Sequence, residues 1–178
     1  QDSDWSHPQF VGSSASSVGM PVLEDVESLD KIILVGSKVL NSTAKDGVME
    51  AQLVYSLFDL SSQTWSAYQP VFERHPRGVV DWLPVFSESG LWMAFIRSTR
   101  AGDGVLGSGQ LMSACFVDGR WSAPEVVVDN SSMITAYSLD ASLDGSAMLA
   151  YRTGESSKVN LCSYSGGWTC KNTDYDLV

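Results

Sequence analysis

Basic side chains, histidine and long apolar runs are all scarce in this 178-residue sequence. Lys and Arg number 11 against 21 Asp and Glu, which gives a net charge of -10. This balance excludes nucleic acid as a partner, because phosphate binding needs an excess of basic side chains. No apolar stretch approaches the roughly 18 residues that cross a bilayer as a helix, so no membrane insertion is predicted.

Patterns that bind metals or catalyse reactions are also missing. The sequence holds two histidines, His7 and His75, and three cysteines, none of them in Cys-x-x-Cys spacing. Structural zinc sites need four such ligands at short, regular spacings. No Gly-x-Ser-x-Gly nucleophile elbow is present either. We therefore predict no metal site, no cofactor and no catalytic residue.

What the sequence does contain is an internal repeat. Tryptophan opens four similar segments, at Trp5, Trp65, Trp121 and Trp168, and the first three continue with serine and a nearby proline. The segments follow one another at intervals of 47 to 60 residues. This interval suits one four-stranded propeller blade, which takes about 40 to 50 residues plus loop insertions.

A second set of features keeps the same register. Turn-like segments precede three apolar runs, at Ser28–Lys31, Ser87–Gly90 and Ser142–Gly145. Two of them end in glycine, which tolerates the positive φ of tight turns. Seven residues after each segment comes a basic residue: Lys38, Arg97 or Arg152. Eight residues before the two glycines lie the aromatic residues Trp82 and Tyr137.

Strand-like runs fill the space between these markers. The second strands are expected at residues 32–35, 91–96 and 147–151, and the third strands at 52–58, 110–117 and 159–164. No window of twelve residues has a helical stripe. We therefore predict an all-β protein of three four-stranded antiparallel propeller-type blades, an incomplete propeller completed by oligomerisation or by further chain segments. The single repeat domain 1–178 divides into a leading strand in 1–19 and units 20–79, 80–132 and 133–178.

Two short motifs resemble known propeller families. The turn Pro84–Gly90, followed by Trp92–Arg97, resembles the TolB-type repeat, in which a Pro-aromatic-Ser-Pro-Asp-Gly turn precedes an Ile-Ala-Phe strand. The turn Asp118–Ser122 is similar to the sialidase-type repeat, whose Asp-box turn ends in tryptophan. Glu88 and Leu143 replace the TolB-type proline, and the complete Asp-box is absent. The resemblance implies a fold, and a propeller fold does not fix a function.

The cysteines predict one disulfide. Around the turn at Gly166, Cys162 and Cys170 occupy directly opposed positions of a hairpin, where disulfide geometry is accessible. A disulfide favours an oxidising compartment, and hence a secreted or cell-surface location. The same alignment places Cys115 opposite Ala123, as a free and buried thiol.

Several residues are candidates for ligand binding or modification. Lys38, Arg97 and Arg152 are suited to carboxylates or sugar hydroxyls, and the alternative is a structural ion pair with a turn carboxylate such as Asp30 or Asp144. Trp82, Trp92 and Tyr137 are candidates for exposed aromatic rings, with burial in the core as the alternative. The sequons at Asn41 and Asn130 are glycosylation acceptors if the source has a secretory route.

Three blades do not close a ring, because propellers use four to eight. We therefore predict a non-enzymatic binding or assembly scaffold that associates with copies of itself or with partner propeller segments. Recognition is expected on the blade edges and on the long loops 41–50 and 99–109. One alternative is a lectin-like propeller that binds glycans. The other is a sialidase-like glycoside hydrolase fragment, for which Arg97, Arg152 and Tyr151 supply part of the residue set.

Overall fold

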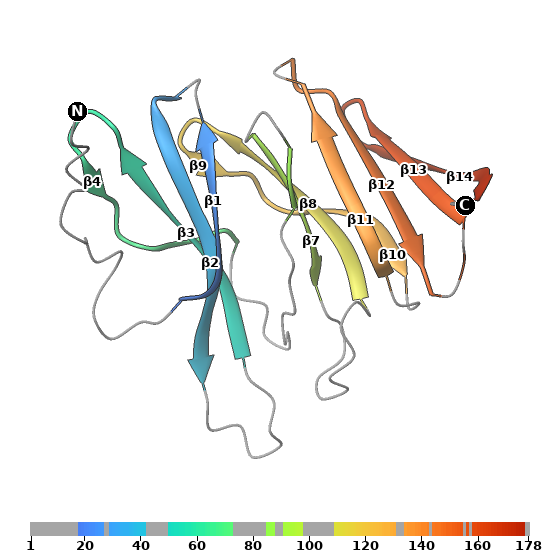
Figure 1. Ribbon diagram of the computed structural model, residues 1–178, viewed down its shortest axis with the longest axis horizontal. Helices are drawn as coiled ribbons and strands as arrows, with labels where there is room; N and C mark the ends of the chain where they lie inside the picture. Colours follow the sequence, from blue (N-terminus) through green and yellow to red (C-terminus); the bar gives the residue numbers. More distant parts are fainter. Residues whose placement is uncertain are drawn as a thin grey trace, which may run out of the picture.

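The computed structural model describes most of the chain between residues 18 and 176. The described ranges are 18–26, 29–41, 50–72, 85–87, 91–97, 109–130, 134–142, 144–154, 156 and 158–176. At 18–20, 39–41, 50–51, 130 and 174–176 only the backbone is described. Within these ranges the regular elements, β1 to β14, are all strands, so the all-β prediction is confirmed (Figure 1). No helix in these ranges has the length and apolar character to cross a bilayer.

The first sheet is an antiparallel meander. Its strands are β1 (Val18–Val26), β2 (Lys31–Asn41), β3 (Glu50–Asp59), β4 (Thr64–Trp65) and β5 (Gln69–Pro70). Their order is β1-β2-β3-β4, and β5 also pairs with β3. Because Trp65 pairs with Phe58 and Pro70 pairs with Val54 along the same neighbour, β4 and β5 are two pieces of one fourth strand.

The middle and last sheets repeat this plan. The middle sheet holds β6 (Val85–Phe86), β7 (Trp92–Arg97), β8 (Gly109–Val117), β9 (Arg120–Trp121) and β10 (Glu125–Asn130). Both β9 and β10 pair with β8, so the fourth strand is interrupted here as well. The last sheet holds β11 (Ile134–Ala141), β12 (Ala147–Thr153), β13 (Lys158–Tyr164) and β14 (Trp168–Asp176), in that order. The prediction of three four-stranded antiparallel units is confirmed.

The Trp-Ser motif explains the interruption of the fourth strand. Ser66 and Ser122 each donate a backbone N–H to the third strand, to the carbonyls of Leu57 and Cys115. Their hydroxyls accept the return bonds from the N–H groups of Leu57 and Cys115, at 2.9 and 3.1 Å. The serine hydroxyl thus replaces a backbone carbonyl as the acceptor between the third and fourth strands. The backbone of the fourth strand can therefore bend away from the third strand at this point. In the last sheet Thr169 pairs regularly with Ser163, and β14 is one strand whose pairing becomes irregular only beyond Asn172.

Each sheet has two unlike faces. On one face the repeated tryptophan lies against an aromatic residue of the third strand, with ring centroids 5.1 to 5.4 Å apart. The three pairs are Phe58–Trp65, Phe116–Trp121 and Tyr164–Trp168. We call this side of each sheet the tryptophan face and the other side the reverse face.

The three sheets stack with one rule: a tryptophan face packs on the reverse face of the preceding sheet. One buried cluster joins the reverse face of the first sheet to the tryptophan face of the middle sheet. The first sheet contributes Ile33, Val35, Leu53 and Tyr55, and the middle sheet contributes Met93, Phe95, Met112, Phe116 and Trp121. A second cluster joins Trp92, Ala94, Ile96 and Leu111 on the middle sheet to Leu149, Tyr151, Cys162 and Trp168 on the last sheet. The same succession of sheets is visible from blue to red in Figure 1.

Aromatic rings make the closest contacts between the sheets. Trp92 of the middle sheet lies 4.7 Å from the ring of Tyr164 and 5.9 Å from that of Trp168. Trp168 also donates its Nε1 proton to the Ser113 hydroxyl across the interface, at 2.7 Å. The equivalent Trp121 is buried, and its Nε1 has no acceptor within the described ranges. Two of the repeated tryptophans, Trp121 and Trp168, therefore pack between neighbouring sheets.

Candidate functional site

The three basic candidates end the second strand of each sheet, but they do not share one face. Lys38 and Arg97 lie six residues after Ile32 and Leu91, which pair with the aromatic residue of the third strand. Arg152 lies only five residues after its equivalent, Ala147. Since side chains alternate along a strand, Arg152 is on the reverse face whereas Lys38 and Arg97 are on tryptophan faces.

The cause of this difference is the distance between the turn glycine and the second strand. Gly90 directly precedes Leu91, but Ser146 separates Gly145 from Ala147. The Ser146 carbonyl accepts a backbone hydrogen bond from the Ser142 N–H, so Ser146 belongs to the turn. The expected equivalence of the basic residues is therefore corrected: it holds for the first two sheets and not for the last.

Both arginines make hydrogen bonds across neighbouring strands. Arg97 donates to the Gln110 side-chain oxygen, from Nε at 3.1 Å and also from Nη2. Gln110 in turn donates to Asp129 at 3.2 Å, so the chain of contacts crosses β7, β8 and β10. Arg152 donates from Nε to the Thr135 hydroxyl at 3.2 Å. Both guanidinium groups are thus held by neutral side chains. Within the described ranges, the alternative of an ion pair with a turn carboxylate is not what the structure shows for the two arginines.

The structure does not bring the predicted site residues together. Tyr137 is half-buried opposite Tyr151 and packs in the core between the last and middle sheets. Tyr151 is buried on the same tryptophan face, while its neighbour Arg152 is on the reverse face. Arg97 belongs to the other interface, between the first and middle sheets. The three residues that the sialidase-like alternative needs thus lie on three different faces.

Some predicted sites fall outside the described residues. These are Trp82, the leading strand around Trp5, and the loops 42–49 and 98–108. Asn41 and Asn130 end β2 and β10, and only their backbone is described. Their glycosylation stays a prediction.

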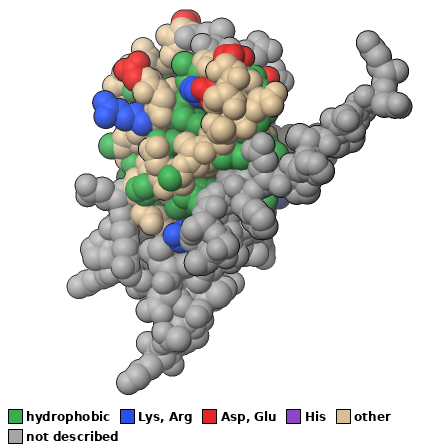
Figure 2. Space-filling model, turned by 90° about the vertical axis from the view of Figure 1, so that its left-hand side faces the viewer, with side chains coloured by type: hydrophobic (Ala, Val, Ile, Leu, Met, Phe, Trp, Pro, Cys, Tyr) green, Lys and Arg blue, Asp and Glu red, His purple; other side chains and the backbone are tan. Residues whose placement is uncertain are grey.

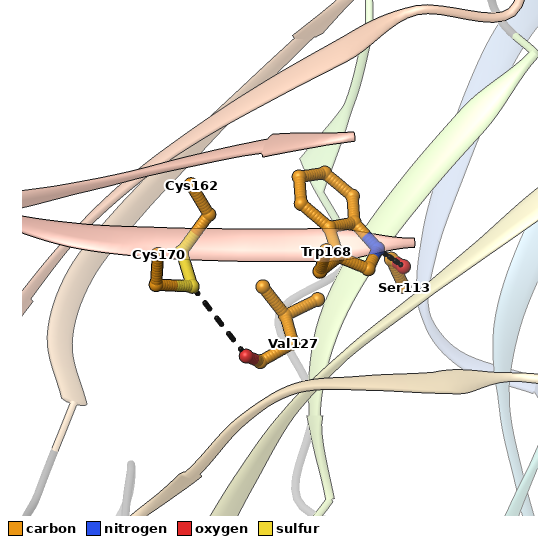
Figure 3. Close-up of a disulfide and its surroundings, with 5 residues drawn as sticks. All are labelled: Ser113, Val127, Cys162, Trp168 and Cys170. Carbon is orange, nitrogen blue, oxygen red and sulfur yellow. Dashed lines mark hydrogen bonds between the residues drawn. A yellow bond between two sulfur atoms is a disulfide. The ribbon is translucent and has the colours of Figure 1, made fainter. Parts of the chain in front are cut away.

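The Cys162–Cys170 disulfide is present, as predicted (Figure 3). The two residues are directly opposed in the β13–β14 hairpin, with Cα atoms 4.0 Å apart. The Cys170 sulfur lies 3.5 Å from the Val127 carbonyl oxygen of β10. This is a van der Waals contact, because a disulfide sulfur carries no proton. The bridge therefore lies between the last and middle sheets.

The pairing predicted for Cys115 is wrong by one residue. Its backbone exchanges hydrogen bonds with Ser122, not with Ala123. The reason is the two-residue turn at Asp118 and Gly119, both with positive φ, which pairs Val117 with Arg120. Cys115 is a free thiol, as expected, and is half-buried.

The reverse face of the last sheet exposes apolar side chains at positions that are core elsewhere. Met148 is 57% exposed and Leu161 is 37% exposed. By strand pairing, Met148 is the equivalent of Ile33 and Trp92 in the first and middle sheets. Those two residues are buried beneath the next sheet.

The opposite end of the stack also carries apolar side chains. Figure 2 looks at the side of the molecule where β3 and β4 lie, and hydrophobic side chains (green) run across its described part. The pair Phe58–Trp65 is half-buried on the tryptophan face of the first sheet. Leu23, opposite Leu34 on the same face, is 58% exposed, whereas Leu34 and Val54, which also lie on this face, are buried.

A polar groove of about 450 Å³ lies at the end of the last sheet where β12 turns into β13. Its lining residues are Tyr151, Thr153, Ser156, Lys158, Asn160, Asn172 and Thr173. Asn160 is paired with Tyr151 on one side and with Asn172 on the other, so these three side chains share the tryptophan face. Burial raises the pKa of the Tyr151 phenol. This groove was not predicted from the sequence, because its residues come from three strands and from the turn between β12 and β13.

Comparison with known proteins does not assign the chain to a family. No protein-family model matches the sequence, and no curated protein matches it either. The resemblance to TolB-type and sialidase-type repeats therefore stays a prediction. Within the described ranges, no group of three or more His, Cys, Asp or Glu side chains is placed to hold a metal ion.

Proposed function

We propose that the chain is a non-enzymatic assembly scaffold that associates with a second copy of itself. In this association the tryptophan face of the first sheet docks on the reverse face of the last sheet of the other copy. The observation that carries the proposal is the exposure of Met148 and Leu161 at positions whose equivalents are buried in the other two sheets.

The interface between the middle and last sheets supports this choice of partner surface. There, an aromatic pair of the tryptophan face, Tyr164 and Trp168, packs on Trp92. Met148 occupies the position of Trp92 in the last sheet, and Phe58–Trp65 is the corresponding pair in the first sheet. A second copy would place this pair over Met148, and methionine sulfur packs favourably against aromatic rings.

The number of sheets also supports association of two copies. The described part of each chain forms three sheets, so two copies supply six, within the four to eight of closed propellers. Arg152 and Lys171 lie on the reverse face of the last sheet. They outnumber Asp140, the exposed partner of Met148 on the same face, so this surface does not add to the repulsion expected from a net charge of -10 per chain.

Light scattering coupled to size-exclusion chromatography tests the proposal. We expect the native protein to have twice the monomer mass of 19.3 kDa, and Met148→Asp to have the monomer mass. Val117→Asp is the matched control, because Val117 is similarly exposed, at 54%, but belongs to the middle sheet, whose two faces are covered within the chain. We expect it to keep the native mass.

Two outcomes would overturn the proposal. One is a native protein that elutes as a folded monomer of 19.3 kDa. The other is a Met148→Asp variant that keeps the native mass.

A further inference from the structure

The polar groove of the last sheet interrupts an otherwise apolar pattern. By strand pairing, Asn160 occupies the position of Val54 in the first sheet and Met112 in the middle sheet. Val54 and Met112 are buried. The tryptophan face of the last sheet begins with the apolar Tyr164 and Trp168, continues with the disulfide, and becomes polar at Asn160. An amide has replaced a core side chain in one sheet of the three.

Several hydrogen-bonding groups of the groove are not used within the described chain. The amides of Asn160 and Asn172 and the hydroxyls of Thr153 and Tyr151 have no side-chain hydrogen bond to another described residue. Lys158, which is exposed at the margin, makes no ion pair within the same ranges. By contrast, Ser156 accepts from the Lys158 N–H, and Thr173 donates to the Val159 carbonyl. The unused groups therefore gather on one surface.

We propose that this groove binds a saccharide. An amide offers a donor and an acceptor side by side, as do Thr and Tyr hydroxyls, and neighbouring sugar hydroxyls offer the same combination. The volume of about 450 Å³ lies within the range of small-molecule sites, about 300 to 1,000 Å³. Lys158 adds one cation at the margin, so an acidic sugar binds more tightly than its neutral analogue.

This site is independent of the self-association proposed above. The groove is on the tryptophan face of the last sheet, whereas Met148 is on the reverse face. The monomeric Met148→Asp variant is therefore expected to keep saccharide binding, so that failure of one proposal leaves the other intact.

The test is a glycan array of neutral and acidic mono- and oligosaccharides, followed by titration of the best ligand. We expect a dissociation constant below about 10 mM and a loss of affinity of about tenfold or more in Asn160→Leu. Leucine restores the apolar character that this position has in the other sheets, so the variant is expected to fold. Asn172→Ala, at an exposed position, provides a second variant with the same expected loss.

Ser163→Ala is the control, because Ser163 is exposed on the same strand but on the opposite face. It is expected to bind as tightly as the native protein. The proposal is overturned if no saccharide on the array binds, or if Asn160→Leu and Asn172→Ala retain native affinity.

Discussion

At the scale of single residues, cysteine pairing shows what local spacing can predict. Cys162 and Cys170 flank a short turn, so counting outward from Gly166 identifies them as opposed residues. The same counting misplaced Cys115 by one residue, because the turn at Asp118 and Gly119 is one residue shorter than assumed. A pairing predicted from a turn is only as accurate as the assumed turn length.

The disulfide is expected to stabilise the fold measurably. Cross-linking two residues eight apart restricts the unfolded chain, so Cys162→Ala/Cys170→Ala should lower the free energy of unfolding by about 2 to 3 kcal/mol. Urea unfolding at neutral pH measures this difference. Cys115→Ala, which removes a half-buried free thiol, should cost less. A double variant with native stability would contradict the expectation.

Acid stability should depend on the ion pair between Lys31 and Asp59. The Lys31 hydrogen bond, 2.6 Å long, and the hydrogen bonds from Ser61 and Ser62 hold the pKa of the Asp59 carboxyl well below its usual range. A carboxyl whose folded pKa is depressed stabilises the fold above the unfolded pKa of about 3.9, and this contribution is lost as the pH falls below it.

The comparison of native protein and Asp59→Asn tests this dependence. Urea midpoints between about pH 2.5 and pH 6 should fall more steeply on acidification in the native protein than in the variant. Asp118→Asn serves as the control, since Asp118 makes no ion pair within the described ranges, and it should follow the native slope. Parallel slopes for the native protein and Asp59→Asn would refute the role of the pair.

At the scale of elements, the strands were predictable, but their cross-strand partners were predicted correctly only for the β13–β14 hairpin. The second and third strands lie where the turn signals and apolar runs place them. Counting outward from Gly166 pairs Tyr164 with Trp168 correctly. The partners of the other two tryptophans, Phe58 and Phe116, were missed, because they lie seven and five residues before Trp65 and Trp121 rather than four. Only the pairing of strands shows that they are equivalent.

The serine of the Trp-Ser motif should contribute to the stability of the interrupted strands. Ser122→Ala leaves the Cys115 N–H without its acceptor, and we expect a loss of about 1 kcal/mol in the free energy of unfolding. Ser66→Ala should have a similar effect through Leu57. Urea unfolding measures both, with the exposed Ser138→Ala as a control of near-native stability. Native stability in both motif variants would show that the hydroxyl is dispensable.

At the scale of the whole molecule, the repeat predicted how many sheets form but not how they stack. The number follows from the spacing of the tryptophans. The stacking rule depends on which side chains of each strand share a face, and one additional residue in a turn reverses that assignment, as Arg152 shows. The polar groove was equally hidden, because Tyr151, Asn160 and Asn172 become neighbours only in the folded sheet.

Self-association predicts that thermal stability depends on protein concentration. An equilibrium between associated and separate chains stabilises the folded state by mass action, so a hundredfold increase in concentration should raise the unfolding midpoint by about 4 °C. Differential scanning calorimetry measures the midpoint. Met148→Asp should show no such dependence, and a native midpoint that is constant with concentration would argue against association.

Because each sheet has two unlike faces, a substitution at the proposed contact has an amplified effect on the dissociation constant of the pair. In a two-chain ring, every chain meets its partner once through each end, so two identical junctions form around one twofold axis. A substitution on either end surface then weakens both junctions. A change that costs about 1.4 kcal/mol at one junction, a factor of ten, would raise the dissociation constant of the pair about a hundredfold.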